Sequence, residues 1–294
     1  MTAILDDIAA RRLAGQPLTA ADAETLAASY DIVTLGMIAD ELRRARHGRA
    51  TTFVRVADLA GPLTDAEPVA WPAAAGELRM TGPFAGIDAA IAAVTRVVTA
   101  AGDVPVTAFS LADLETAAGT PERLASWLAA LRDAGLAAIA EAALDRLATP
   151  APSLAAAAAA ALPVARLVLE SPDTAGPLGL VRRVAGLGEA VEAVLAFAPL
   201  PRRPTEPTTG YADVKAVALS RILLDLAHIQ VDWALHGPKL AQVALTFGAD
   251  DVDRVSPAHE VAEGRRRAPL EEIRRNIRAA SLDPVERDGT FEIL

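Results

Sequence analysis

Residues 210–255 constrain the fold of this chain more than any other stretch, because their hydrophobic period changes twice in succession. Over 212–226 apolar residues recur at helical spacing, and over 228–234 the pattern changes to the period of two that is typical of a strand. A glycine–proline pair then ends the strand and begins a second helix over 238–247, since proline in a first turn loses no hydrogen bond. This order of elements is typical of a barrel built from β/α units.

The same alternation runs through the middle of the chain and implies parallel β-α-β units. The expected strands are 51–56, 77–81, 104–110, 136–139, 165–170, 194–200 and 228–234, and the expected helices between them are 86–101, 121–134, 153–162 and 178–189. We therefore predict an α/β fold, a (β/α) barrel that is full or partial.

The length of 294 residues suits one such barrel as a single domain. We divide 1–294 into a helical lead-in (1–50), a barrel (51–255) and a C-terminal helical tail (256–294).

Charge and hydropathy limit the partners. Lys and Arg number 28 against 38 Asp and Glu, and the net charge of −10 argues against nucleic-acid binding and against an anionic membrane surface. The longest uncharged apolar run, 154–165, is too short to cross a bilayer. The first residues lack the basic-then-apolar order of a signal peptide. These features predict a cytoplasmic protein.

Metal sites find little support in the sequence. The chain has no cysteine, which excludes disulfides, zinc–thiolate sites and cysteine-ligated iron–sulfur clusters. The four histidines show no metal-ligand spacing. Asp250, Asp251 and Asp253 lack the glutamate that would complete a calcium loop, so we expect a helix-terminal turn there and no metal.

Several segments, in this order, resemble one known family: LTAADAETLAASYDIVTLGMIADELRRARHGRATTFV (18–54), ELRMTGP (77–83), PVTAFSLADLETAAGTPERLASWLAALRDAGLAAI (105–139), the stretch 197–253 and LEEIRRNIRAASLDPVERD (270–288). The family is the menaquinone-pathway (futalosine) branch of the radical SAM proteins. It includes aminofutalosine synthase and dehypoxanthine futalosine cyclase, with deazaflavin (FO) synthase as a relative. The resemblance implies a radical-SAM-type barrel and an association with menaquinone biosynthesis.

The chain departs from that family where the family holds its cofactors. The family places three cysteines in the loop after its first strand, whereas ADLAGPLTDAEPVAWPAAAG (57–76) has none. Gly82 is followed by Pro83, which removes a backbone N–H where the family uses a second glycine near SAM. We expect neither a 4Fe-4S cluster nor SAM binding. Whether this chain catalyses any reaction stays open.

Ligands of a parallel barrel meet the C-terminal ends of its strands. The polar or glycine residues expected there are Thr81, Gly82, Glu141, Glu170, Arg202, Gln230 and Asp232.

Each of these residues also has a purely structural interpretation. Glu141 and Glu170 form an acid–base pair, or each caps a following helix or pairs with an arginine. Arg202 binds a carboxylate or phosphate, or lies in a solvated loop. Asp232 needs a partner or a wet cavity, because it lies within a buried strand. No catalytic residue is assigned.

Two functions follow from this pattern. The first is a cluster-free, non-catalytic or auxiliary protein of menaquinone biosynthesis, partnered by a cluster-bearing radical SAM paralogue or another protein of that pathway. The second is an enzyme or binding protein that needs neither iron nor SAM. It would use Glu141, Glu170 and Arg202 on a nucleoside-like or aromatic carboxylate ligand. The state of the barrel mouth separates these hypotheses: either a polar cavity is open there, or Trp71 and its loop plug it.

Overall fold

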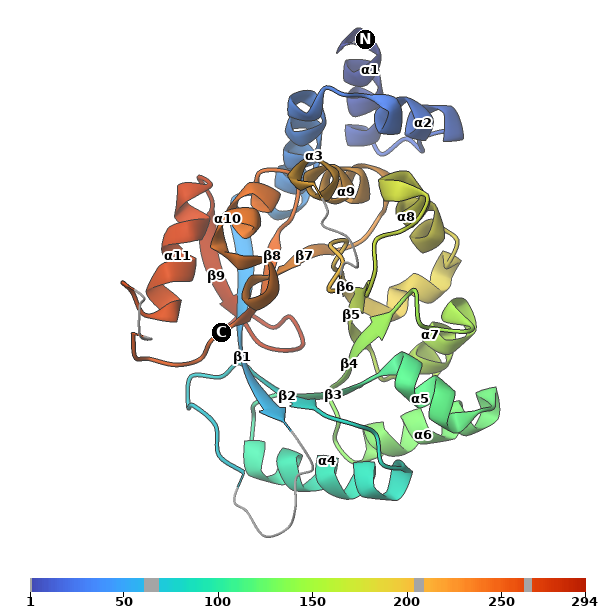
Figure 1. Ribbon diagram of the computed structural model, residues 1–294, viewed down its shortest axis with the longest axis vertical. Coiled ribbons are helices and arrows are strands. Elements are labelled where there is room, and N and C mark those ends of the chain that lie inside the picture. Colours follow the sequence, from blue (N-terminus) through green and yellow to red (C-terminus); the bar gives the residue numbers. More distant parts are fainter. Residues whose placement is uncertain (1, 61–68, 204–208, 262–265) are drawn as a thin grey trace.

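A closed barrel of parallel strands forms the centre of the protein in the computed structural model, which describes residues 2–60, 69–203, 209–261 and 266–294 (Figure 1). The strands are β1 (Ala50–Ala60), β2 (Glu77–Thr81), β3 (Val106–Ser110), β4 (Ala138–Ala143), β5 (Val164–Val168), β6 (Val194–Phe197), β7 (His228–Asp232), β8 (Asp251–Val255) and β9 (Asp283–Arg287). Strands β2 to β8 pair in sequence order, and β1 pairs with both β8 and β2, so the first eight strands close the barrel predicted from the sequence.

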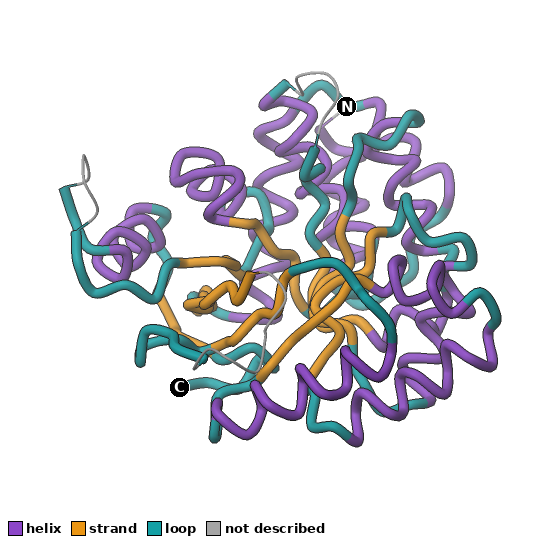
Figure 2. Tube along the Cα trace, turned by 60° about the horizontal axis from the view of Figure 1, so that its bottom comes forward, coloured by secondary structure: helices purple, strands orange, loops and turns teal. Residues whose placement is uncertain are grey.

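Helices surround the barrel, as the tube in Figure 2 shows. They are α1 (Thr2–Leu13), α2 (Ala20–Ala28), α3 (Ile32–His47), α4 (Ile87–Ala101), α5 (Leu111–Ala118), α6 (Pro121–Asp133), α7 (Pro150–Ala159), α8 (Gly176–Ala185), the 3-10 helix η1 (Gly188–Ala193), α9 (Gly210–Leu223), α10 (Trp233–Leu245) and α11 (Pro269–Ala279). Among the described residues, no helix is both long and apolar enough to cross a bilayer.

The helical lead-in comprises α1, α2 and α3, which lie together at one end of the molecule beside α9 (Figure 1). Thr19 and Asp22 form a reciprocal capping box at the start of α2: Asp22 N–H donates to the Thr19 hydroxyl, and Thr19 N–H donates to the Asp22 carboxylate. In α3, Leu35, Ile38 and Ala39 supply the buried apolar face.

The acidic stretch after α10 forms strand β8, which corrects the expected helix-terminal turn. Asp251 and Asp253 lie two positions apart and are both buried, so they share the inward face of β8. Barrel interiors are usually filled by branched apolar residues. Two inward carboxylates break that pattern, so the sequence of this strand resembles that of a turn. Their burial is possible because arginines from other strands meet them.

The C-terminal tail contributes a strand as well as helix α11. Strand β9 pairs in parallel with the first half of β1, in the register Ala50↔Asp283 to Val54↔Arg287. The second half of β1 pairs with β2 on the register Val56↔Glu77. One long strand therefore carries two successive neighbours along the same edge, and the tail is built into the barrel wall.

Candidate functional site

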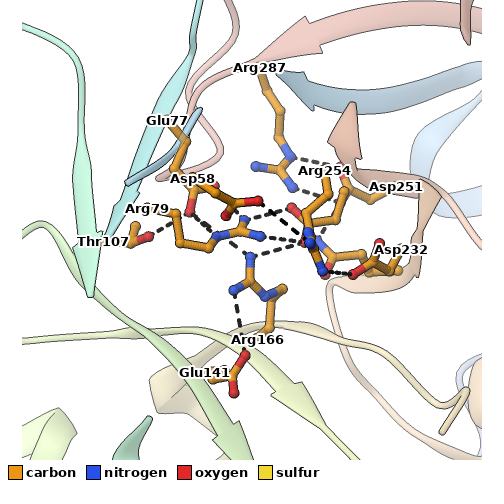
Figure 3. A network of polar contacts seen from close by, with 12 residues as sticks. Asp58, Glu77, Arg79, Thr107, Glu141, Arg166, Asp232, Asp251, Arg254 and Arg287 are labelled. Carbon is orange, nitrogen blue, oxygen red and sulfur yellow. Dashed lines mark hydrogen bonds and ion pairs between the residues drawn. The ribbon is translucent and has the colours of Figure 1, made fainter. Parts of the chain in front are cut away.

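The barrel interior contains an ionic network in place of the usual apolar layers (Figure 3). Arg79, on β2, donates to both oxygens of Glu77 at 2.8 and 2.9 Å and to both oxygens of Asp253 at 2.8 and 3.1 Å. Thr107, on β3, donates its hydroxyl to Glu77 Oε1 at 2.6 Å. Glu77, Arg79 and Asp253 are all buried, and each carboxylate meets a bidentate guanidinium.

A second buried arginine, Arg166 on β5, shares Asp253 with Arg79. Its Nη1 lies 3.0 Å from Asp253 Oδ2, and its Nη2 lies 3.9 Å from Glu141 Oε2. Burial and the nearby Arg79 lower the pKa of Arg166. Burial alone would raise the pKa of Glu77 and of Asp253, but attraction to Arg79 and Arg166 outweighs it and holds both values below normal. The network is therefore ionised at neutral pH.

The end of the barrel at which the strands begin, here called the lower end, is sealed by a separate ion pair. Arg287, on β9, donates to Asp251 through Nε at 2.6 Å and Nη2 at 2.7 Å, and Gln230 Nε2 donates to the same carboxylate at 2.7 Å. The Phe291 ring stacks on the Arg287 guanidinium at 3.7 Å and on the His228 ring at 4.3 Å. The tail thus covers the N-terminal ends of the strands.

Above the network, a cavity of about 260 Å³ opens at the C-terminal ends of the strands. One wall is apolar and comes from Val168, Ala198 and Leu200. The rest of the lining is polar or charged: Asp58, Arg79, Thr81, Glu141, Arg166, Arg202, Gln230, Asp232, His236, Asp253 and Arg254. Convergent polar groups beside an apolar surface at this end of a parallel barrel are typical of a ligand site.

Arg202 joins the two carboxylates that the sequence singled out. Its Nη1 lies 2.6 Å from Glu141 Oε2 and 3.7 Å from Glu170 Oε1. Arg203 Nε lies 3.3 Å from the other oxygen of Glu170. Burial would raise the pKa of Glu141, but attraction to Arg202 and Arg166 lowers it. A carboxylate held ionised by an arginine is a poor proton donor. Glu141 and Glu170 therefore resemble the acceptors of salt bridges with Arg202 more than an acid–base couple.

Asp232 serves two roles at the end of β7. Its Oδ1 accepts from Leu235 N–H at 2.9 Å and so caps α10, while its Oδ2 lies 3.2 Å from Arg254 Nη1. Arg254 has a positive φ of 57°, a left-handed conformation that is unfavourable for a side chain of this kind. Such strain persists where the surrounding structure fixes the backbone. Here Arg254 forms part of the cavity wall.

Five of the seven site residues expected from the sequence line the cavity: Thr81, Glu141, Arg202, Gln230 and Asp232. Glu170 does not line it but holds Arg202 and Arg203. Gly82 lines a separate apolar pocket with Met80 and Pro83. Trp71 packs against the main core and is not part of the cavity lining.

Sequence reasoning missed the arginines and the aspartates that form the rest of the lining. These residues are Asp58, Arg79, Arg166, Asp253 and Arg254. A signal was present in ELRMT, where Glu77 and Arg79 lie two apart on one face of a strand otherwise made of apolar residues and threonine.

The donor set does not fit an iron–sulfur cluster. The chain offers carboxylate oxygens and guanidinium nitrogens at the cavity and has no thiolate anywhere. In the loop after β1, residues 69–76 are described and 61–68 lie outside the described residues. No step that depends on such a cluster can be assigned to this chain.

Three curated proteins with different names illustrate what the chain is similar to in sequence. The chain is 35% identical over 97 residues to the aminodeoxyfutalosine synthase of Streptomyces coelicolor, and the matched segment covers 31% of this chain and 25% of that protein. It is 33% identical over 90 residues to the cyclic dehypoxanthine futalosine synthase of the same organism, covering 29% and 23%. It is 34% identical over 100 residues to the 5-amino-6-(D-ribitylamino)uracil–L-tyrosine 4-hydroxyphenyl transferase of Archaeoglobus fulgidus, covering 31% and 29%. The matched segments thus span about a quarter of these relatives.

Solved structures agree on the fold over nearly the whole chain. Methylornithine synthase superposes with a TM-score of 0.67 at 12% identity, covering 94% of this chain and 97% of that one. The FeFe-hydrogenase maturase HydG from Carboxydothermus hydrogenoformans gives a TM-score of 0.63 at 12% identity, covering 96% and 79%. No protein-family model matches the chain. The resemblance to the futalosine branch of the radical SAM proteins is confirmed by the sequence relatives, and the barrel is confirmed by the structures.

Proposed function

We propose that this chain, a radical-SAM-like barrel without cluster ligands, binds a small anionic ligand at its mouth and serves menaquinone biosynthesis as a non-catalytic auxiliary protein. The observation that carries the proposal is the cavity of about 260 Å³, which is walled by ionised groups already held in place by one another. A preorganised site binds without the free-energy cost of ordering its side chains. The partner is a cluster-bearing paralogue or another protein of that pathway, since the chain itself has no cysteine.

The cavity supports an aromatic carboxylate more than a nucleoside. Its volume of about 260 Å³ is below the ~300–1,000 Å³ of pockets for drug-sized ligands, which suits a single substituted ring. The apolar wall of Val168, Ala198 and Leu200 suits the face of the ring. Arg166 Nη2 lies 3.9 Å from Glu141 Oε2, too far for a hydrogen bond to it, and can donate to a ligand carboxylate.

Benzoate and adenosine are the probes for this site, with melting temperature and isothermal titration as readouts. Arg202→Met should abolish benzoate binding, because it removes a cationic wall of the cavity. Arg203→Met is the matched control, since Arg203 is the next residue and its side chain is 84% exposed. Benzoate binding that is equal in both variants, or a preference for adenosine, contradicts the proposed site.

The auxiliary role is tested in the organism. Deletion of the gene should lower menaquinone, and the Arg203→Met variant should restore it whereas the Arg202→Met variant should not. Normal menaquinone after deletion would refute the pathway assignment while leaving ligand binding intact.

The second candidate is catalysis by Glu141, Glu170 and Arg202. What favours it is that both carboxylates lie within 3.7 Å of Arg202 Nη1 near the strand ends. It requires Glu141 to change protonation state, which its lowered pKa opposes. Turnover of an aromatic carboxylate without iron or SAM, lost in Glu170→Gln, would favour this enzyme over the auxiliary protein.

A further inference from the structure

Two histidines and an aspartate converge beneath the barrel, at the opposite end from the cavity. His47 is the last residue of α3, His228 is the first of β7, and Asp250 directly precedes β8. One nitrogen of each imidazole and one carboxylate oxygen lie within 4.8 Å of one another. His47 Nε2 is 3.5 Å, and His228 Nδ1 is 2.6 Å, from Asp250 Oδ2. Three separate segments of the chain thus bring metal-ligating atoms within 4.8 Å of one another.

The outer contacts of this group hold the carboxylate in a fixed orientation. Asp250 is buried, and its Oδ1 accepts from the Arg221 guanidinium and from Ile229 N–H at 2.8 Å. Its Oδ2 is left to face the two imidazoles. Metal-ligating carboxylates are commonly fixed through their second oxygen in this way. On the other side, the Phe291 ring stacks on His228 at 4.3 Å and holds its plane.

Each ligating imidazole nitrogen now contacts an oxygen atom, and it must be free of a proton to bind a metal. His47 Nε2 lies 2.9 Å from the Ala227 carbonyl and would release that contact when it ligates.

We propose that His47, His228 and Asp250 form a site for a divalent transition metal, with Zn²⁺ as the best fit. Zinc accepts imidazole nitrogen and carboxylate oxygen at ~2.0–2.2 Å in a tetrahedron, which places ligand atoms roughly 3.3–3.6 Å apart. The His47–Asp250 distance of 3.5 Å meets this requirement, and the 2.6 Å between His228 and Asp250 must open by about 1 Å. Three protein ligands leave a fourth position for water. The site is separate from the cavity at the barrel mouth.

The test uses the full chain, free of any histidine tag and treated with EDTA, titrated with Zn²⁺ by calorimetry and with Co²⁺ by visible absorption. One ion per chain should bind, and Co²⁺ should give the absorption of a tetrahedral site. His47→Gln and His228→Gln should each weaken Zn²⁺ at least as much as loss of an outer-shell partner does, ~10–100-fold. His259→Gln is the control, because His259 is exposed and outside the group.

Asp250→Asn gives a second route, since the amide keeps an acceptor for Ile229 N–H but loses the ligating charge. Circular dichroism of each metal-free variant establishes that it is folded. The proposal is overturned if the folded wild-type chain binds no Zn²⁺, or if binding survives in the double His47→Gln/His228→Gln variant. The three side chains then form a hydrogen-bonded group and nothing more.

Discussion

The two ends of this barrel use the same chemistry for different purposes. At the lower end, Arg287 and Asp251 are fully buried, bind each other in bidentate fashion and are covered by Phe291. At the mouth, Arg202 and Glu141 form an equally close pair, but their side chains are 25% and 19% exposed and border a cavity. An arginine–carboxylate pair that is sealed is out of reach of a ligand, whereas one beside a cavity can exchange its partner for a ligand.

The largest expected effect separates the two ends directly. Arg287→Met should lower the free energy of unfolding by about 3–5 kcal/mol, because it leaves Asp251 charged and buried without its partner. Arg202→Met should lower it by only about 1–2 kcal/mol, since water reaches Glu141. Urea denaturation at pH 7 measures both. Equal losses would show that the mouth is as structural as the base.

The network between the two ends should respond to acid. Glu77→Gln should lower the free energy of unfolding by about 2–3 kcal/mol at neutral pH, since Arg79 loses one of its two carboxylates. The pKa of Glu77 is lowered in the folded chain, so its stabilisation is complete above the unfolded value of about 4.3 and is lost as the pH falls through the folded value.

The difference in free energy of unfolding between wild type and Glu77→Gln should therefore stay constant from pH 7 to 5 and shrink below about pH 4.3. Urea denaturation across this range measures it. A difference that already disappears between pH 7 and 5 would mean that Arg79 and Arg166 do not lower the pKa of Glu77.

Phe291 tests whether the lower end is independent of the mouth. Phe291→Ala removes a ring stacked on Arg287 and His228 and should lower the free energy of unfolding by about 1–2 kcal/mol. Benzoate binding at the mouth should not change. Weaker benzoate binding in the folded variant would show that the two ends are coupled.

The smallest effect belongs to an exposed pair, Arg182 with Glu24, which joins α8 to α2. Glu24→Gln should change the free energy of unfolding by less than about 0.5 kcal/mol, because both side chains are more than half exposed and water screens them. This variant is the reference for an ion pair without burial. A loss comparable to that of Arg202→Met would mean that burial does not explain the contrast.

The alternation of periods in the sequence is enough to predict the barrel but not all of its strands. Strands β1 to β7 match the strand-like segments that alternate with helical ones in the sequence, with ends displaced by a few residues. Strand β8 was missed because its inward positions carry Asp251 and Asp253. Helix α5 was also missed, since it begins at Leu111 directly after β3 without a turn between them.

The candidate site was predictable at the strand ends and not inside the strands. Thr81, Glu141 and Asp232 follow from the rule that ligands meet the C-terminal ends of barrel strands. Arg79 and Arg166 lie within strands, where arginine normally marks an exposed face, and only the fold shows that they meet Asp253. The same holds for the histidine pair, since no local spacing connects residues of α3 and β7.

The pairing of Arg79 with Asp253 has a consequence for biosynthesis. The two residues are 174 positions apart, so at 5–20 residues per second the ribosome needs roughly 9–35 s to make the second after the first. Arg166 lies 87 positions before Asp253, so during the second half of that interval both guanidiniums have been made and their shared counter-ion has not. Strand β8 also pairs with both β7 and β1, so the barrel can close, and these two arginines can meet Asp253, only after β8 has been made.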